Sequence, residues 1–542
     1  MSDGERVFGF GEHQNGRLDS KGLRFDFEQC IEYFPSKGGE VCLPWVLAAD
    51  AGAVQYGFLW NNPSYGAVDF GAEGTTWSAR GPARQIDFLV VTAPAAGAAR
   101  AGAEIMRRYA DAVGHAPNFP EWAAGYWHSK NRYATQDALL AAAEGFANRS
   151  VPVDIIVVDY HHWKRMGDWS FDNASWPDVP AMVDTLRAMG TRVMVSVWPF
   201  SATGSASIGA IEAGGLAVRA ADNASLAWWN DNNCDADCYL YDPSLPAARA
   251  LVWERVFDGY VRAGIDVFWL DASEPEVSTA DAQAAADAGV YAAGAARDVG
   301  LLFPVWHTQT FYDGLVDAKG GPAAADGEIV MLTRSAWAGM SRHAAALWSG
   351  DTQSTFASLK ASVPAALNAQ LSGVAWWTSD VGGYAGGDPS DATFRELAVR
   401  WFQFGLVCPI LRQHGARDTE IWLLGDEAEA AVTAAIALRA ELKGYVMEQM
   451  ARVAADGTPV NRPLWFDAPH DAAAWAVDDE LMFGPDLLAA PVLEYGARNR
   501  TLYLPDRAVR WKHHYSGEVF AGGQTVTVDA PLAEFPLFHR LA

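Results

Sequence analysis

The chain has 542 residues, of which half are hydrophobic and a fifth are charged, so the composition fits one large globular domain with one or two smaller ones. Its formal net charge of −26 repels phosphate backbones and anionic lipid surfaces, which argues against nucleic-acid and membrane-surface partners. The N-terminal segment MSDGERVFG lacks an apolar signal region, and no long apolar run follows it, so we expect a cytoplasmic protein with a neutral or cationic ligand.

Two of the five cysteines, Cys234 and Cys238, form the motif CDADC. This spacing is compatible with a small disulfide or with a pair of metal ligands. No His or Cys pair with zinc-like spacing accompanies the motif, so we expect no metal and no cofactor.

Residues 1–115 are rich in glycine and contain short segments of alternating polarity, such as 54–60 (VQYGFLW) and 85–92 (QIDFLVVT). Alternation with a period of two is typical of strands that bury one face. An alanine-rich stretch at about 95–113 then predicts a helix. We expect these residues to form part of a β-sandwich.

Residues 116–458 alternate apolar segments with amphipathic or alanine-rich stretches, a pattern typical of βαβ units and a parallel sheet. Helices are predicted between most of the segments, at 136–147, 182–189, 247–263 and 394–404. Eight strands in this arrangement predict a (β/α)8 TIM barrel and therefore the α/β fold class. The predicted strands are 125–128, 155–159, 193–198, 267–271, 329–334, 347–351, 374–380 and 408–414.

Seven of these eight strands end on a side chain that can bind or react. In a (β/α)8 barrel the carboxyl ends of the strands converge on one face, where active sites are built. An Asp at a strand end is also a common helix N-cap, so each residue taken alone has a structural explanation. Capping does not readily account for the whole ring of Asp159, Trp198, Asp271, Arg334, Asp351, Asp380 and His414.

Residues 459–542 return to short β-like segments separated by turns. Examples are 487–494 (LLAAPVLE), 500–505 (RTLYLP) and 524–532 (QTVTVDAPL). Their spacing predicts a small antiparallel sandwich. Neither end of the chain carries a recognisable catalytic cluster, so the chemistry is expected in the barrel.

Cleavage of a glycosidic bond needs two carboxyl groups that flank it. The predicted barrel face offers four Asp residues, a cation for hydroxyl groups and indole rings for the C–H face of a sugar. The spacing of the acids does not assign their roles, and composition alone leaves a metal-dependent hydrolase open. The acids are Asp159, Asp271, Asp351 and Asp380.

The segment FWLDASEPE (268–276) resembles the nucleophile signature of glycoside hydrolase family 31. LTRSAWAG (332–339) and LWSGD (347–351) resemble the Arg-containing strand and the acid/base strand of that family. IIVVDYHHW, WWTSDVGGY and PILRQHG resemble its sugar-binding strands. These six motifs follow the family's order over about residues 120–420, and RPLWF, LLAAPVLE and YLP fit its C-terminal β-domain.

The resemblance implies a retaining α-glycosidase with a covalent glycosyl-enzyme, in which Asp271 is the nucleophile and Asp351 the general acid/base. We expect Arg334 to favour the ionised nucleophile, and burial or the charge of Asp271 to raise the pKa of Asp351. Glu274 would be a supporting residue. The sugar in the cleavage subsite would contact Asp159, Asp380, Arg334 and His414 through its hydroxyl groups, with Trp269 and Trp348 as walls and Trp198 beside them.

Within the family, GYWHSKNRY (125–133), SVWPF (196–200) and WLDASEPE most resemble bacterial α-xylosidases and their α-glucosidase relatives. The expected substrate is therefore a glycoside or oligosaccharide with a terminal, non-reducing α-linked xylose or glucose, with xylose favoured. Xylose lacks the hydroxymethyl group of glucose, and the sequence does not show what fills that space. Sulfoquinovose or galactose specificity, transglycosylation and a non-catalytic sugar-binding barrel stay open, although both catalytic Asp residues are present.

One departure from the family lies near the N-terminus. The family carries a complete β-sandwich before a GFGEH-like segment, which begins here at residue 9. The first strands of that sandwich are therefore missing or replaced. Because a loop of that domain helps to shape the pocket in the family, this departure affects the expected substrate more than the expected chemistry. The sequence does not indicate an oligomeric state.

Overall fold

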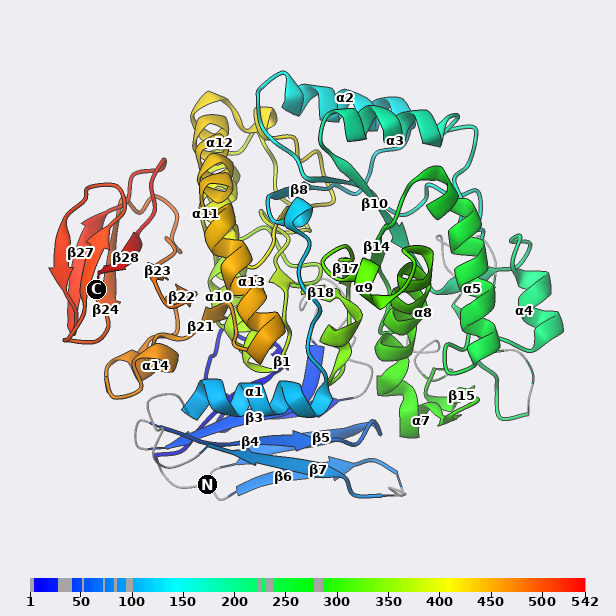
Figure 1. Cartoon of the computed structure of the whole chain (residues 1–542), viewed down its shortest axis with the longest axis horizontal. Coiled ribbons are helices and arrows are strands. Elements are labelled where there is room, and N and C mark those ends of the chain that lie inside the picture. The colour runs from blue at the N-terminus through cyan, green and yellow to red at the C-terminus, as the bar shows by residue number, and fades with distance from the viewer. Residues whose placement is uncertain are drawn as a thin grey trace.

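The computed structural model describes residues 4–27, 41–50, 53–71, 74–81, 85–93, 101–222, 224, 226–229, 237–276, 284 and 286–541. A central barrel is flanked by two sheets from the N-terminal part of the chain and two from the C-terminal part (Figure 1). Among the described residues, none of the helices is both long and apolar enough to cross a bilayer.

The barrel is an eight-stranded parallel sheet in the order β19-β18-β17-β14-β10-β9-β8-β20. Each of the eight predicted segments contributes one strand, so the predicted fold class is confirmed. The strands are short and buried on both faces, which explains their continuous apolar sequences. They are β8 (Tyr126–His128), β9 (Ile155–Val158), β10 (Arg192–Val197), β14 (Val267–Leu270), β17 (Met331–Thr333), β18 (Ala345–Trp348), β19 (Trp377–Thr378) and β20 (Leu411–Gln413).

The barrel closes between β19 and β20 with sparse backbone pairing. An isolated parallel bridge joins Val381 to Gln413, and the amide of Ile410 donates to the carbonyl of Trp377 at 3.2 Å. Directly beside this seam, the guanidinium of Arg412 donates to the carboxylate of Asp380, and both side chains are fully buried. A side-chain ion pair therefore links β19 and β20 where they share few backbone hydrogen bonds.

Helices cover the outside of the barrel and follow the predicted pattern, with differences at their ends. α2 (Gln136–Ala147) and α11 (Ala392–Gly405) match their predicted segments closely. α3 (Val179–Ala188) begins earlier than predicted because Asp178 caps its first turn by accepting from the Ala181 amide at 3.1 Å. The predicted helix 247–263 is α5 (Pro246–Gly259) followed by a separate 3₁₀ turn. The other long helices are α8 (Phe303–Ala318), α10 (Phe356–Leu371), α12 (Asp426–Glu441) and α13 (Lys443–Asp456).

The N-terminal part forms a sandwich of two antiparallel sheets, as predicted, with an aromatic interior. Phe10 packs edge-on against Phe70 and Trp77 between the sheets, at centroid distances of 5.7 Å. The helix α1 (Ala101–Val113) lies along the four-stranded sheet (Figure 1). The sheets are β1-β3-β4-β7 and β2-β5-β6, built from β1 (Arg6–Glu12), β2 (Arg24–Phe27), β3 (Val41–Asp50), β4 (Ala53–Trp60), β5 (Gly66–Gly71), β6 (Gly74–Ala79) and β7 (Phe88–Thr92).

Strand β1 attaches this sandwich to the barrel. The amides of Gly9 and Gly11 donate to Asn368 Oδ1 of α10 and to Ser372 Oγ, the C-cap residue of that helix, at 2.9 and 2.6 Å. Gly11 has φ +93°, and a Cβ there would lie 1.9 Å from the Val41 carbonyl, so no other residue fits this register. The GFGEH segment thus docks the N-terminal sheets onto a helix of the barrel.

The C-terminal part is an antiparallel sandwich, again as predicted. Arg400 of α11 is fully buried and donates to carbonyls of this domain, including Ala530 at 2.8 Å and Glu534 at 3.0 Å, so the domain is tied to the barrel. One sheet has the order β21-β22-β23-β28-β25-β26 and the other pairs β24 with β27. The strands are β21 (Asn461–Arg462), β22 (Leu481–Phe483), β23 (Leu487–Ala489), β24 (Asn499–Leu504), β25 (Arg510–His513), β26 (Val519–Ala521), β27 (Gln524–Asp529) and β28 (Leu537–Leu541).

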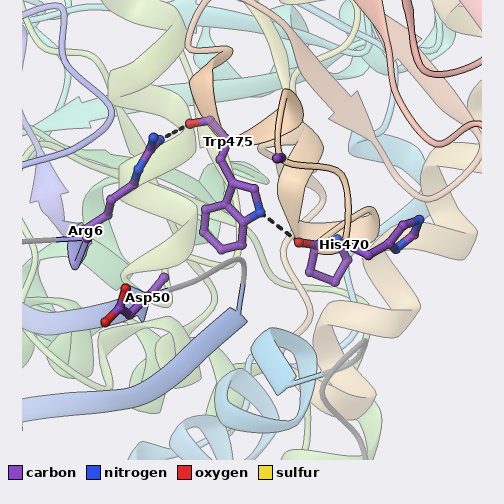
Figure 2. A pocket seen from close by; sticks show the side chains of 8 residues that line it. Arg6, Asp50, His470 and Trp475 are labelled. Carbon is purple, nitrogen blue, oxygen red and sulfur yellow. Dashed lines mark hydrogen bonds between the residues drawn. The ribbon is translucent and has the colours of Figure 1, made fainter.

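A cavity of about 430 Å³ lies between the N-terminal sheet and the segment that precedes β22. Figure 2 shows Arg6 pointing toward Trp475, whose backbone carbonyl accepts a hydrogen bond from the guanidinium. Trp475 in turn donates from its indole to the Pro469 carbonyl at 2.9 Å, and His470 points away from Trp475, with its Nε2 3.4 Å from Asp506 Oδ1. The hydrogen bond from Arg6 to Trp475 joins the two terminal domains.

Candidate active site

A smaller cavity, of about 140 Å³, opens at the carboxyl ends of the barrel strands. Its lining is mainly polar and includes four carboxylates, one guanidinium and one imidazole, which come from five different strand ends. Such a mixture matches the hydroxyl groups of one sugar ring better than an apolar ligand. The lining residues are Asn131, Asp159, Tyr160, Trp198, Trp269, Asp271, Glu276, Arg334, Asp351, Tyr384 and His414.

Asp271 follows β14 directly and is held by hydrogen-bond donors on both carboxylate oxygens. Oδ1 accepts from the Ala272 amide at 2.8 Å, and Oδ2 accepts from the indole N–H of Trp198 at 3.1 Å. Ala272 has φ +53°, a left-handed conformation that turns its amide back toward the carboxylate. The side chain of Asp271 is therefore fixed in one orientation.

Arg334 follows β17 and lies against three carboxylates. Its Nε is 2.7 Å from Glu274 Oε1, while its Nη1 is 2.5 Å from Glu276 Oε2 and 3.7 Å from Asp271 Oδ1. Burial raises the pKa of Asp271, and Arg334 is the strongest influence in the opposite direction. Arg334 therefore favours the ionised form, as expected, but shares its charge with two glutamates.

Asp351 lies three residues beyond β18 and also lines the cavity. Burial raises the pKa of Asp351 to about 7, against the lowering effect of Arg334 and with a further contribution from the charge of Asp271. None of the described residues donates a hydrogen bond to its carboxyl group. The predicted direction of this pKa shift is confirmed, and a carboxyl group of this kind can hold a proton near neutral pH.

Asp159 and His414 follow β9 and β20 and form a second polar group in the cavity. His414 Nε2 is 3.7 Å from Asp159 Oδ2, and His414 Nδ1 is 2.7 Å from the hydroxyl of Ser129. Burial lowers the pKa of His414 well below its ordinary value, so the imidazole is neutral. The ring also stacks on Tyr384, with centroids 5.4 Å apart.

Trp269 lines the cavity, whereas two other predicted sugar-binding residues, Trp348 and Asp380, lie one layer below it. Trp348 is 1% exposed and packs edge-on against Trp269, with centroids 5.2 Å apart. Asp380 is fully buried and pairs with Arg412, whose guanidinium lies 4.6 Å from the Trp269 ring centroid. Neither residue is among those that line the cavity in this structure, and their predicted contacts with the sugar stay predictions.

Sequence reasoning did not single out five residues of the site. Each of them lies inside a motif that was read for a neighbouring residue, as Glu276 does in FWLDASEPE and Arg412 in PILRQHG. A search of the three residues on either side of each strand-end Asp or His would have found two of them, Tyr160 and Arg412. The five are Asn131, Tyr160, Glu276, Tyr384 and Arg412.

The larger cavity between the terminal domains does not offer the same chemistry, because among the described residues Asp50 is the only carboxylate that lines it. Within the described ranges, no group of three or more His, Cys, Asp or Glu side chains is placed to hold a metal ion. Cys238 of the CDADC motif is disulfide-bonded, in agreement with the first of the two roles, and Cys234 lies outside the described residues. The absence of a cofactor stays a prediction.

Comparison with known proteins identifies the family. The model of the glycosyl hydrolases family 31 TIM-barrel domain matches residues 116–449, and the model of the family 31 C-terminal domain matches residues 457–541. An uncharacterized family 31 glucosidase of Pseudescherichia vulneris is 36% identical over 420 residues, which cover 77% of this chain and 73% of that protein.

An α-xylosidase of Saccharolobus solfataricus is 30% identical over 557 residues, which cover 100% of this chain and 70% of the relative. Among solved structures, a family 31 α-xylosidase from a soil metagenome, complexed with xylose, superposes with a TM-score of 0.90 at 37% identity. That alignment covers 100% of this chain and 78% of the other. The chain therefore belongs to glycosyl hydrolase family 31 and is a retaining glycoside hydrolase.

Proposed function

We propose that the protein is an exo-acting α-glycosidase that releases a terminal, non-reducing xylose or glucose from α-linked glycosides, with xylose favoured. The observation that carries the proposal is the meeting of Asp271 and Asp351 in one cavity of about 140 Å³, in environments that suit opposite protonation states. A cavity of this size at the end of a closed barrel accommodates one sugar ring, which supports action at a chain end.

In the proposed mechanism, Asp271 Oδ attacks the anomeric carbon from one side of the ring while the bond to the leaving oxygen breaks. Asp351 gives its proton to that oxygen, so the aglycone departs as a neutral alcohol. The product is a β-linked glycosyl ester on Asp271. Asp351, now ionised, takes a proton from water as the water attacks the same carbon, which restores both carboxyl groups and releases the α-anomer.

The other side chains of the cavity are proposed to hold the sugar. Asp159 accepts hydrogen bonds from ring hydroxyl groups, and neutral His414 donates one from Nε2, because Nδ1 faces Ser129. Arg334 binds a hydroxyl group near the nucleophile. Trp269 provides an apolar surface for the C–H face, and Trp348, Asp380 and Arg412 hold that indole from below. Glu274 and Glu276 are proposed to orient Arg334.

The choice of xylose over glucose rests on the relatives aligned over nearly all of this chain. Proteins named α-xylosidase are 30% and 29% identical, and the α-xylosidase of known structure is 37% identical, whereas a relative named α-glucosidase 2, from Bacillus thermoamyloliquefaciens, is 26% identical. The uncharacterized relative named a glucosidase, at 36% identity over 77% of this chain, points the other way. α-Glucosidase activity is therefore the second candidate. The domain boundaries after residues 115 and 458 and the cytoplasmic location also stay predictions.

The proposal is tested by a side-by-side assay of 4-nitrophenyl α-xyloside and 4-nitrophenyl α-glucoside. We expect kcat/KM for the xyloside to exceed that for the glucoside, and proton NMR to show the α-anomer as the first-formed sugar. A preference for the glucoside would change the substrate and leave the mechanism intact. A β-anomer formed first would contradict the mechanism, whichever sugar is preferred.

A further inference from the structure

The indole of Trp198 donates its N–H to the carboxylate of Asp271, and one of its ring faces is covered by Tyr160. Its Nε1 donates to Asp271 Oδ2 at 3.1 Å. One face of the ring is stacked on Tyr160, with centroids 5.5 Å apart and an interplanar angle of 12°. The residue is 6% exposed. A sugar-stacking wall needs an open ring face, and this indole is nearly buried with one face already covered by Tyr160.

The backbone around Trp198 is also held in place. The indole N–H of Trp169 donates to the Trp198 carbonyl at 3.1 Å, and Trp169 is 2% exposed. The amide of Asp271 donates to the carbonyl of the preceding residue, Val197, at 3.1 Å. The ends of β10 and β14 are therefore joined at this point by both the backbone and the indole, which fixes the donor before any ligand binds.

We infer that Trp198 is a positioning residue that keeps the nucleophile oriented and ionised through its indole N–H, and that it is not a sugar-stacking residue. Trp198 differs in this respect from Arg334, whose charge is divided among three carboxylates. An N–H donor to a carboxylate favours the charged form and constrains its direction of attack. The inference rests on the proposed function, because it takes Asp271 as the nucleophile.

Other charged groups face Asp271 from the neighbouring strands and influence its titration. From β17 and β20, the cations Arg334 and Arg412 favour ionisation. The carboxylates that surround it disfavour ionisation, and neutral His414 lies among them. These acids are Asp159 after β9, Glu274 and Glu276 after β14, Asp351 after β18 and Asp380 after β19. The indole N–H of Trp198 acts in the same direction as the two cations without adding charge.

The test is Trp198→Phe, which keeps a flat aromatic ring but removes the N–H donor. For aryl α-xyloside hydrolysis we expect kcat to fall by roughly tenfold to a hundredfold with KM changed less than about threefold. The acid limb of the kcat/KM profile should move to higher pH by roughly half a unit to one unit, since the ionised nucleophile loses a donor. Trp163→Phe is the matched control, because Trp163 is a buried indole in the same apolar cluster.

An acid limb that does not move in Trp198→Phe, or a change confined to KM, would overturn the inference. If that variant does not fold, Trp169→Phe tests the same point, because it removes the donor that holds the Trp198 carbonyl. A smaller shift of the acid limb in the same direction is expected, and no shift contradicts the inference.

A 5-fluoro glycosyl fluoride, followed by peptide mass spectrometry, identifies the nucleophile independently. Label on a residue other than Asp271 would refute the proposed nucleophile, whereas label on Asp271 with unchanged Trp198→Phe kinetics would refute only the role of Trp198.

Discussion

The ends of β14 and β18 each place an Asp in the same cavity but surround it with different partners. Asp271 receives hydrogen bonds from an amide and an indole and lies 3.7 Å from a guanidinium. Asp351 has none of these donors among the described residues, and burial raises its pKa to about 7. Two identical side chains are thus prepared for different tasks by their surroundings, because fixed donors stabilise a carboxylate and burial without donors stabilises the acid.

The largest effect is expected at the β14 end. Asp271→Ala removes the atom that forms the glycosyl ester, so kcat for an aryl α-xyloside should fall by at least about 10³-fold, with the fold retained. Steady-state kinetics together with a thermal unfolding curve measure both quantities. Turnover near the wild-type level would show that Asp271 is not the nucleophile.

At the β18 end the loss should depend on the leaving group. Asp351→Asn keeps the shape of the side chain but cannot donate an acidic proton, which is worth about 10²–10⁴-fold for an alkoxide-like leaving group. We expect that loss for a disaccharide and a much smaller one for a 2,4-dinitrophenyl glycoside, whose leaving group needs no proton. Equal losses on both substrates would contradict the acid role of Asp351.

The pH dependence of activity should distinguish the two carboxyl groups. Activity needs Asp271 ionised and Asp351 protonated, so kcat/KM should be bell-shaped. The raised pKa of Asp271 sets the acid limb, and the pKa of Asp351, at about 7, sets the basic limb, so activity should decline as the pH rises above about 7. Measurement of kcat/KM between pH 4 and 9 checks this. In Asp351→Asn the basic limb should disappear while the acid limb remains.

The smallest expected effect is on stability. Because the folded-state pKa of Asp351 is raised above the unfolded value of about 3.9, its contribution to stability is present at pH 4 and is lost as the pH rises through about 7. Asp351→Asn removes the ionisable group and with it this loss of stability. The Tm of the variant minus the Tm of the wild type should therefore be larger at pH 8 than at pH 5, by on the order of 2 °C. A difference in Tm that does not change with pH would show that burial of Asp351 carries little energetic cost.

The sequence predicted the barrel well because its strands are buried on both faces and therefore appear as continuous apolar runs. The helix α3 started earlier than predicted since the periodic pattern did not register the Asp178 cap. The strand ends were placed too far along the chain: Asp351 lies three residues past β18. Apolar periodicity records where side chains are buried, and it does not record where backbone pairing stops.

The contents of the cavity were less predictable. The positions at strand ends indicated that four polar residues would meet, namely Asp159, Asp271, Arg334 and His414. They did not indicate that Trp269 would line the cavity while Trp348 packs behind it. Adjacent strands present alternate side chains at different levels, and their stagger is not visible in one sequence. The pairing of Arg412 with Asp380 also needed the three-dimensional register, because the two residues are 32 positions apart on the strands that close the ring.

That pairing has a consequence for how the barrel assembles. The parallel sheet cannot become a closed ring until its last strand meets β19, where the backbone offers few hydrogen bonds. A buried ion pair adds little net free energy, since desolvation offsets most of the attraction, but a strand shifted by one residue would leave Arg412 and Asp380 buried without each other, which is severely unfavourable. Formation of the pair therefore favours the strand register in which Arg412 lies against the Trp269 ring.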